Sequence, residues 1–519
     1  MGVWGLLETA LRRGRWAAPV GVVAIFSALA TAPAGAAPAL PTTETQDPGL
    51  TIGFAEPFHQ DQETNGFLLD RSVDAGSHIA RIAISWADIE PTQPEHPLDP
   101  SDPVYRFDLV DSAVRQAAER GLAVLFTIHD APLWAARPLA SQPGMTLGEP
   151  DTQHPDANAL GAFATALAKR YSGTYVKQPP TGPPITLPRV SLVEPWNEPN
   201  LTGFLSPQWV GKQAYSPELY RLLLNAVYTG YKRIQPDATI IAGATAPAGD
   251  PPGGRRMAPL QFLRKLLCLK GRTKLQARPC PNPARFDVLS HHPISPERTP
   301  REAALGPDDV TISEMYKLRR MLRAAERQHT VLPAGLTRPV WATEFWWETN
   351  LPETIYDSPS ERGQARSIAD ALRLLWEQRI PVALLFQIRD DPDVTGPPRS
   401  GWSTGVLFAD NTPKLSFEAV RFPFVADRVS RRRVSVWTRS PEAGVLDINA
   451  VSKRGTQTMA RIPVHPGQVV QTSFRYRGNA TFVADIENDQ SLPWAAPARR
   501  VTLDPTATPT RDSGDDLDG

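Results

Sequence analysis

VSLVEPWNEPN, residues 190–200, is the stretch of sequence that decides the fold. Its first four residues form an apolar run of the kind found in a strand that is covered on both faces. The run ends in Trp196, Asn197 and Glu198, and a proline then prevents the strand from continuing. We therefore expect a buried strand that presents an aromatic ring, an amide and a carboxylate at one edge of a sheet.

A second strand with the same kind of ending is PVWATEFWW, residues 339–347. It carries Glu344 between apolar and aromatic neighbours. Glutamates are seldom set among tryptophans unless they are paired or functional. Glu198 and Glu344 therefore predict a pair of working carboxylates, although two ordinary surface glutamates would give the same letters.

Apolar runs alternate with amphipathic segments eight times between residues 50 and 425. The expected strands are Leu50–Ala55, Ile79–Ser85, Leu122–Ile128, Val190–Trp196, Thr239–Ala242, Phe286–Ser290, Val340–Glu344 and Val382–Gln387. The expected helices are Leu109–Arg120, Ala157–Tyr171, Pro217–Ile234, Met257–Leu269, Ile312–Gln328, Arg362–Gln378 and Ser416–Val425. Alternating strands and helices form parallel sheets, and eight repeats predict a (β/α)₈ barrel with long loops. A doubly wound open sheet is the alternative, but the glycine-rich turn that usually follows its first strand is absent.

After the barrel the pattern changes to short alternating runs separated by Gly, Pro and Asn. This pattern predicts a small antiparallel β-sandwich. We place the barrel domain at residues 50–427, the β-sandwich at 428–495 and a disordered tail, rich in Thr, Pro and Asp, at 496–519.

The first residues are typical of a targeting segment. A basic region at 12–15 precedes an apolar stretch at 17–32, and small residues at 34–36 fit a cleavage site. We therefore expect a signal peptide at residues 1–36, a linker at 37–49 and a secreted protein. An uncleaved membrane anchor is the alternative, and no other apolar run is long enough to span a membrane.

Charge and cysteine content narrow the partners and cofactors. Acidic and basic residues balance at 55 each, so neither nucleic acid nor an anionic membrane surface is expected as a partner. The two cysteines, Cys268 and Cys280, are close enough in sequence for a disulfide in an exported protein. Two separately buried thiols are the alternative. We expect no metal and no cofactor, because further ligands at the usual spacing are missing.

In a barrel of this kind the functional residues lie at the C-terminal ends of the strands. Those ends supply, in order, Arg81, His129, Trp196, Asn197, Glu198, His291, His292, Glu344, Gln387 and Arg389, with Trp346 just beyond. Aromatic faces stack on sugar rings and carboxylates transfer protons, so this cluster suits the cleavage of a glycosidic bond.

These residues carry a resemblance to clan A glycoside hydrolases, the retaining (β/α)₈ enzymes that include cellulase-like and β-xylosidase-like families. The matching motifs are Trp-Asn-Glu-Pro on the fourth strand and Thr-Glu-Phe on the seventh, and the resemblance covers about residues 50–425. It implies that Glu198 is the general acid/base and Glu344 the nucleophile. It also implies that Asn197 binds the 2-hydroxyl of the sugar and that Arg81 keeps Glu344 ionised.

The chain departs from the family at two places. Ile294 stands where relatives commonly have a tyrosine two residues after the histidine of the sixth strand. The eighth strand carries Phe386 where many relatives have a tryptophan that supports the sugar, so Phe386 or Trp402 would have to serve. The expected substrate-binding residues are Arg81, His129, Trp196, Asn197, His292, Trp346 and Trp402.

Two other functions remain open at this stage. The departures at Ile294 and Phe386 also suit a non-catalytic carbohydrate-binding protein that keeps a glycosidase fold. A metal-dependent barrel hydrolase could use His129, His291 and His292, but the expected His-x-His spacing is absent. The leading expectation is a secreted retaining hydrolase of a β-linked oligo- or polysaccharide.

Overall fold

The computed structural model describes residues 49–56, 58, 61–140, 144–295, 299–349, 360–392 and 401–496. The expected signal peptide at 1–36, the linker apart from Gly49, and the tail from residue 497 onward lie outside the described residues. Within those ranges, no helix combines the length and the apolar character that crossing a bilayer requires.

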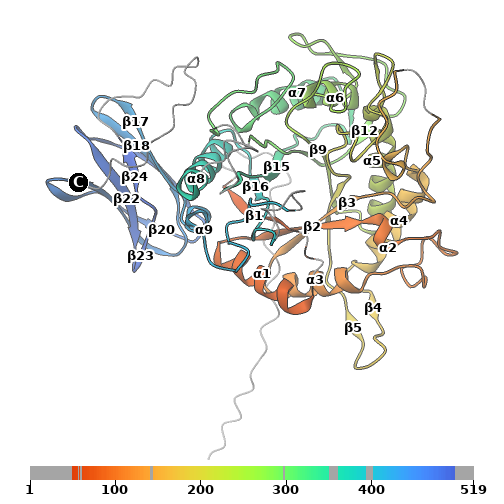
Figure 1. The fold of residues 1–519 in the computed structure, drawn as a ribbon, viewed down its shortest axis with the longest axis horizontal. Coiled ribbons are helices and arrows are strands. Elements are labelled where there is room, and N and C mark those ends of the chain that lie inside the picture. The colour runs from red at the N-terminus through yellow and green to blue at the C-terminus, as the bar shows by residue number, and fades with distance from the viewer. Residues whose placement is uncertain are drawn as a thin grey trace, which may run out of the picture. The chain divides into compact units, whose positions relative to one another are not determined.

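Eight parallel strands close into a barrel, so the predicted fold is confirmed (Figure 1). Around the barrel the strands follow chain order, and the last pairs with the first. They are β1 (Thr51–Glu56), β2 (Ile79–Ser85), β3 (Ala123–His129), β6 (Leu192–Pro195), β9 (Thr239–Thr245), β13 (Val288–His291), β15 (Val340–Phe345) and β16 (Val382–Leu385). Because all eight are parallel, their C-terminal ends meet at one mouth of the barrel.

Helices surround this barrel (Figure 1). They are α1 (Gln62–Asp74), α2 (Trp86–Ile89), α3 (Asp108–Glu119), α4 (Ala157–Arg170), α5 (Ser216–Ile234), α6 (Pro259–Leu266), α7 (Tyr316–Arg327), α8 (Glu361–Glu377) and α9 (Leu415–Arg421). Single turns of 3₁₀ helix occur at η1 (Pro150–Thr152) and η2 (Ile312–Glu314). The loops between these elements carry four two-stranded ribbons, which are β4 (Val176–Lys177) with β5 (Ile185–Thr186), β7 (Trp209–Val210) with β8 (Gln213–Ala214), β10 (Leu269–Lys270) with β11 (Gln276–Ala277), and β12 (Ala284–Arg285) with β14 (Val331–Leu332).

Several helices differ from the sequence-based expectation: α2 was not predicted, and α6 and α7 are shorter than expected. Helix α1 was not predicted, because Asn65 and Gly66 lie on its buried face and interrupt the apolar stripe. Asp61 begins this helix by accepting hydrogen bonds from the amides of residues 63 and 64. Helix α9 ends at Arg421 rather than at residue 425, because Pro423 cannot continue a helix.

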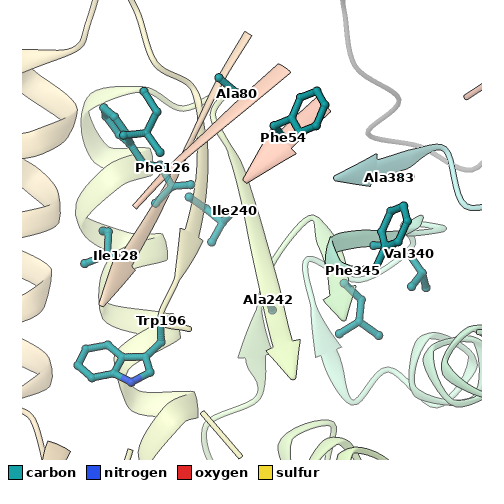
Figure 2. Packing of buried hydrophobic residues seen from close by; sticks show 14 of the residues in the cluster. Phe54, Ala80, Phe126, Ile128, Trp196, Ile240, Ala242, Val340, Phe345 and Ala383 are labelled. Atoms are coloured by element: carbon teal, nitrogen blue, oxygen red, sulfur yellow. The ribbon is translucent and has the colours of Figure 1, made fainter. Parts of the chain in front are cut away.

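Each strand of the barrel packs apolar side chains on both faces. One set, which includes Ile79, Leu125 and Trp341, forms a small cluster of its own inside the barrel. The residues that alternate with them pack against the helices in a much larger core, part of which is shown in Figure 2. This alternation decides which side chains face the barrel interior, because residues two apart on a strand share a face.

The C-terminal strands form two antiparallel sheets around a second apolar core. One sheet contains β17 (Phe424–Ser430), β18 (Arg433–Arg439) and β21 (Val469–Arg475). The other contains β19 (Gly444–Ser452), β20 (Gly455–Val464), β22 (Ala480–Ile486), β23 (Asp489–Gln490) and β24 (Trp494–Ala496). The expected β-domain is therefore present.

Helix α8 joins the barrel to this β-domain. Arg301 forms ion pairs with Asp370 of α8 and with Asp427 of β17, the latter at 2.9 Å. Trp376 of α8 also packs against Trp437 of β18, with ring centroids 6.3 Å apart. Arg421 of α9 adds an ion pair with Asp489 of β23, and Arg439 of β18 donates to the carbonyl of Gly76 at 3.4 Å. These contacts fix the β-domain to the side of the barrel.

Cys268 and Cys280 form a disulfide that closes the turn after α6 around β10 and β11. We expect the double substitution Cys268→Ala with Cys280→Ala to lower the free energy of unfolding by about 2–3 kcal/mol, because the unfolded chain gains the freedom of the opened loop. Urea unfolding monitored by circular dichroism would measure the loss. Wild-type protein treated with dithiothreitol should show the same loss, and an unchanged unfolding midpoint would contradict the expectation.

Candidate active site

Arg81 lies at the centre of the polar residues at the barrel mouth. It shares the inner face of β2 with Ile79, and its side chain is almost fully buried. Its Nε donates to Glu194 at 2.9 Å, its Nη1 to Glu344 at 3.2 Å and its Nη2 to Asn197 at 2.8 Å. One guanidinium thus orients groups from the fourth and the seventh strands.

Glu194, which the sequence analysis did not single out, also binds that guanidinium. It is fully buried, and it also accepts hydrogen bonds from Thr127 on β3 and Thr343 on β15, both at 2.9 Å. Burial alone would raise the pKa of Glu194, but Arg81, His292 and the hydroxyl donors outweigh burial and the pKa is lowered. Glu194 is therefore a fixed anion that holds Arg81 in place. The sequence does contain a sign of this buried anion: Thr127 and Thr343 are inward-facing hydroxyl residues in otherwise apolar strands.

The backbone after β6 leaves the strand conformation and thereby aims Glu198. Trp196 and Glu198 have positive φ angles of 72° and 38°, and Ala244 on the neighbouring strand has one of 44°. Non-glycine residues adopt such angles only where the surroundings impose them. The amide of Glu198 donates to the carbonyl of Ala244 at 3.0 Å, which ties the two irregular strand ends together.

Trp196 does not lie where the sequence-based interpretation placed it. Its indole is fully buried in the large core, and its Nε1 donates to the carbonyl of Phe204 at 2.8 Å. Because the ring has no exposed surface, a sugar cannot stack on it in this structure. The prediction that Trp196 binds substrate is therefore corrected: the positive φ turns the ring outward and leaves Asn197 and Glu198 at the mouth.

A β-bulge aims Glu344. Trp341 and Thr343 face the barrel interior, so a regular β15 would turn Glu344 outward, away from the site. The register between β15 and β16 shifts between Ala342 and Phe345. Bulges of this kind re-aim a single side chain, and here the carboxylate of Glu344 reaches Arg81.

His292 contacts both candidate carboxylates. Its Nδ1 lies 3.1 Å from Oε1 of Glu198 and 3.6 Å from Oε2 of Glu344. The two oxygens can therefore be no farther apart than the sum of these distances. Burial lowers the pKa of His292 to about 4, so the ring is neutral near pH 7. In the tautomer that carries the proton on Nδ1, this nitrogen donates to the carboxylates.

The two carboxyl groups differ in their partners and so in their proton affinity. Burial raises the pKa of Glu198 to about 7, with only a smaller lowering effect from Arg81. Burial also raises the pKa of Glu344, but His292 and Arg81 lower it, and Arg81 bonds to Glu344 directly. Arg81 thus favours the ionised form of Glu344, but desolvation is the larger effect and the pKa of Glu344 is raised overall. The first proton nevertheless leaves Glu344, since it alone of the two holds a guanidinium.

The other two histidines of the strand ends make structural contacts. His291 is fully buried between the hydroxyl of Thr245 at 2.8 Å and the carbonyl of Val310 at 3.1 Å. The Nδ1 of His129 lies 2.7 Å from Asp130, and its side chain remains 20 % exposed. Across the described ranges, no three His, Cys, Asp or Glu side chains are arranged to hold a metal ion.

An aromatic wall follows the ends of β15 and β16. It consists of Trp346, Trp402 and Phe386: the centroids of Trp346 and Trp402 are 5.3 Å apart, and Phe386 meets Trp402 edge-on at 6.3 Å. Trp402 is 42 % exposed. Gln364 of α8 supports the wall from behind, because its side-chain amide donates to the carbonyl of Trp347 at 2.8 Å.

Asn200 is a site-supporting residue that the sequence did not single out. Its amide nitrogen donates to the carbonyls of Ala246 at 3.1 Å and Met257 at 2.8 Å, and its oxygen accepts from the amide of Ala246 at 2.8 Å. It thereby fastens the turn after Glu198 to the end of the fifth strand.

Comparison with known proteins adds the following. No protein-family model matches the chain, and no curated protein matches it. Among solved structures, it is similar to a family 39 glycoside hydrolase from Bacteroides cellulosilyticus (17% identity, 83% of this chain and 82% of that one, TM-score 0.49). It is also similar to a GH30 endoxylanase from Clostridium papyrosolvens (11% identity, 84% and 96%, TM-score 0.41). A third is GH5_18 from Streptomyces cattleya in complex with GlcNAc (16% identity, 72% and 79%, TM-score 0.44). The function of this chain is therefore argued from its own residues.

Proposed function

We propose that this chain is a retaining glycoside hydrolase that cleaves a β-linked oligo- or polysaccharide, with Glu344 as nucleophile and Glu198 as general acid/base. The observation that carries the proposal is the single nitrogen of His292 that contacts both carboxylates. The resulting upper limit on the separation of the two oxygens admits the spacing of about 5–5.5 Å in retaining enzymes and leaves only the short edge of the about 6.5–9.5 Å range of inverting ones.

In the first step the ionised oxygen of Glu344 attacks the anomeric carbon of the sugar. Glu198, whose raised pKa of about 7 keeps a large fraction protonated up to that pH, gives its proton to the glycosidic oxygen as the bond to the leaving group breaks. The product is a glycosyl ester on Glu344 and a free alcohol. Arg81 and His292 compensate the charge changes on Glu344 as the ester forms and later breaks.

In the second step water attacks the same carbon from the face that the leaving group vacated. Glu198, now ionised, takes a proton from that water, and the bond to Glu344 breaks to restore its carboxylate. Asn197 is held by Arg81 through its oxygen, so its amide NH₂ group faces away from the guanidinium and toward a sugar hydroxyl. Two inversions at one carbon give net retention of configuration.

Export and the β-linkage belong to the same proposal. The basic and apolar N-terminal sequence supports secretion, and a disulfide is typical of an exported chain. The β-linkage follows the resemblance of the Trp-Asn-Glu-Pro and Thr-Glu-Phe motifs to clan A enzymes. The wall of Trp346, Trp402 and Phe386 provides the aromatic surface on which a sugar ring stacks.

The proposal is tested by covalent trapping. The protein is incubated with a panel of activated 2-deoxy-2-fluoro β-glycosides, digested and analysed by mass spectrometry. A sugar adduct on the peptide that contains Glu344 is the expected result, and the sugar that labels fastest identifies the substrate class. Binding of polysaccharide without any adduct or hydrolysis would contradict the proposal and favour a carbohydrate-binding protein.

The pH dependence follows from the pKa of Glu198. Because this pKa is raised to about 7 and the acid must be protonated to act, kcat/KM should fall above about pH 7, tenfold for each further pH unit. Hydrolysis of an unactivated glycoside measured from pH 4 to pH 9 checks this. A profile that stays flat to pH 9 would exclude Glu198 as the acid.

A further inference from the structure

Lys414 is a buried ammonium group that joins three separate segments near the barrel mouth. Its Nζ donates to Oδ1 of Asp390 at 2.8 Å, to the hydroxyl of Thr349 at 2.9 Å and to the carbonyl of Ser403 at 3.3 Å. The side chain has no exposed surface. It therefore links the residues that follow the seventh strand, those that follow the eighth and the segment that carries Trp402.

Further hydrogen bonds tighten the same junction. The amide of Thr349 donates to the carbonyl of Ser403 at 3.1 Å, and the amide of Gly405 donates to Asp390 at 2.8 Å. Trp402 itself is held on both sides by Asp391: its amide donates to the Asp391 carboxylate at 2.8 Å, and the amide of Asp391 donates to its carbonyl at 3.0 Å. The backbone on either side of the exposed indole is thus fixed.

The buried ion pair at this junction contributes little net free energy to stability. Removing two charges from water offsets most of their attraction, and apolar replacements of such pairs are often neutral or stabilising. What the ion pair of Lys414 and Asp390 provides is one geometry, since the ammonium group and the carboxylate each have defined partners. In that geometry the ring of Trp402 packs against the ring of Trp346, which lies two positions after Glu344 in the sequence.

We propose that Lys414 is a positioning residue for sugar binding, which acts through Trp402. Its ammonium group holds the 401–405 segment so that the indole of Trp402 faces the sugar bound at Glu344. The inference rests on the proposed function, and it names a residue that touches neither the sugar nor the reacting atoms.

The first test compares Lys414→Met with the wild type on the 4-nitrophenyl β-glycoside that the wild type cleaves best. We expect KM to rise about fivefold to tenfold, the worth of one aromatic stacking contact, with kcat changed by less than about twofold. Arg170→Met is the matched control, because it strips the guanidinium from the buried Asp111 between α3 and α4. This control should lose stability and leave KM unchanged. If it raised KM equally, the effect would be structural and the inference would be wrong.

A double-mutant cycle decides whether Lys414 acts through Trp402. In a Trp402→Ala background, Lys414→Met should raise KM by less than about twofold further, because the ring that it positions is gone. Asp390→Asn, which keeps an oxygen for the amide of Gly405, repeats the cycle if Lys414→Met does not fold. Additive effects overturn the inference alone. A wild type that cleaves no glycoside overturns the proposed function, and the inference falls with it.

Discussion

Replacement of Glu344 by alanine should reduce kcat by at least about 10⁴-fold, because no other group is placed to form the glycosyl ester. The bulge in β15 turns Glu344 toward Arg81, and the other glutamate that Arg81 holds, Glu194, is fully buried. Hydrolysis of an aryl glycoside, together with circular dichroism to confirm folding, provides the measurement. The fluoro-sugar adduct should disappear from the same variant.

The matched control for this variant is Glu119→Ala. Glu119 is a surface glutamate at the end of α3, and its carboxylate lies 3.8 Å from Arg115 on the same helix. Its loss should leave turnover unchanged. Near-normal activity in Glu344→Ala, with the control equally active, would mean that the nucleophile has been assigned to the wrong residue.

Replacement of Glu198 by alanine should give a loss that depends on the leaving group. For a poor leaving group, which needs a proton, we expect kcat to fall about 10²–10⁴-fold. For a dinitrophenyl glycoside, which leaves without a proton, the first step should be nearly normal and hydrolysis of the ester should become limiting. Added azide should then restore turnover and give a β-glycosyl azide, because a small anion fits the space that the carboxylate leaves.

The pH profile provides a second measurement on this variant. The decline above about pH 7 should vanish in Glu198→Ala, because the group that titrates there has been removed. An azide product of the opposite configuration would contradict the retaining mechanism. Equal losses for good and poor leaving groups would contradict the role of Glu198 as acid.

The barrel was predictable from sequence because its signals are local and repeated. Each strand of a buried parallel sheet is a short apolar run, and each helix has its own stripe. The strand ends then follow, which is why Arg81, Asn197, His292 and the two candidate carboxylates could be named together. The structure places all five at one mouth.

The direction in which individual side chains point was not predictable in the same way. Alternation along a regular strand places Trp196 inside the barrel and Glu344 outside, and the structure reverses both. The reversals come from positive φ angles and from a register shift, which neighbouring strands impose. The importance of Glu194 was missed for a related reason, since its partners come from three strands that are distant in sequence.

Helix α8 has a consequence for how this protein can be divided. Its outer side meets the β-domain through Arg373, which lies 3.5 Å from Asp427 of β17, and through Trp376, while Gln364 near its start donates to the carbonyl of Trp347. A barrel cut free before β17 would lose these contacts and leave that side of the helix exposed to solvent. We therefore expect the barrel and the β-domain to be transferable between proteins only as one unit.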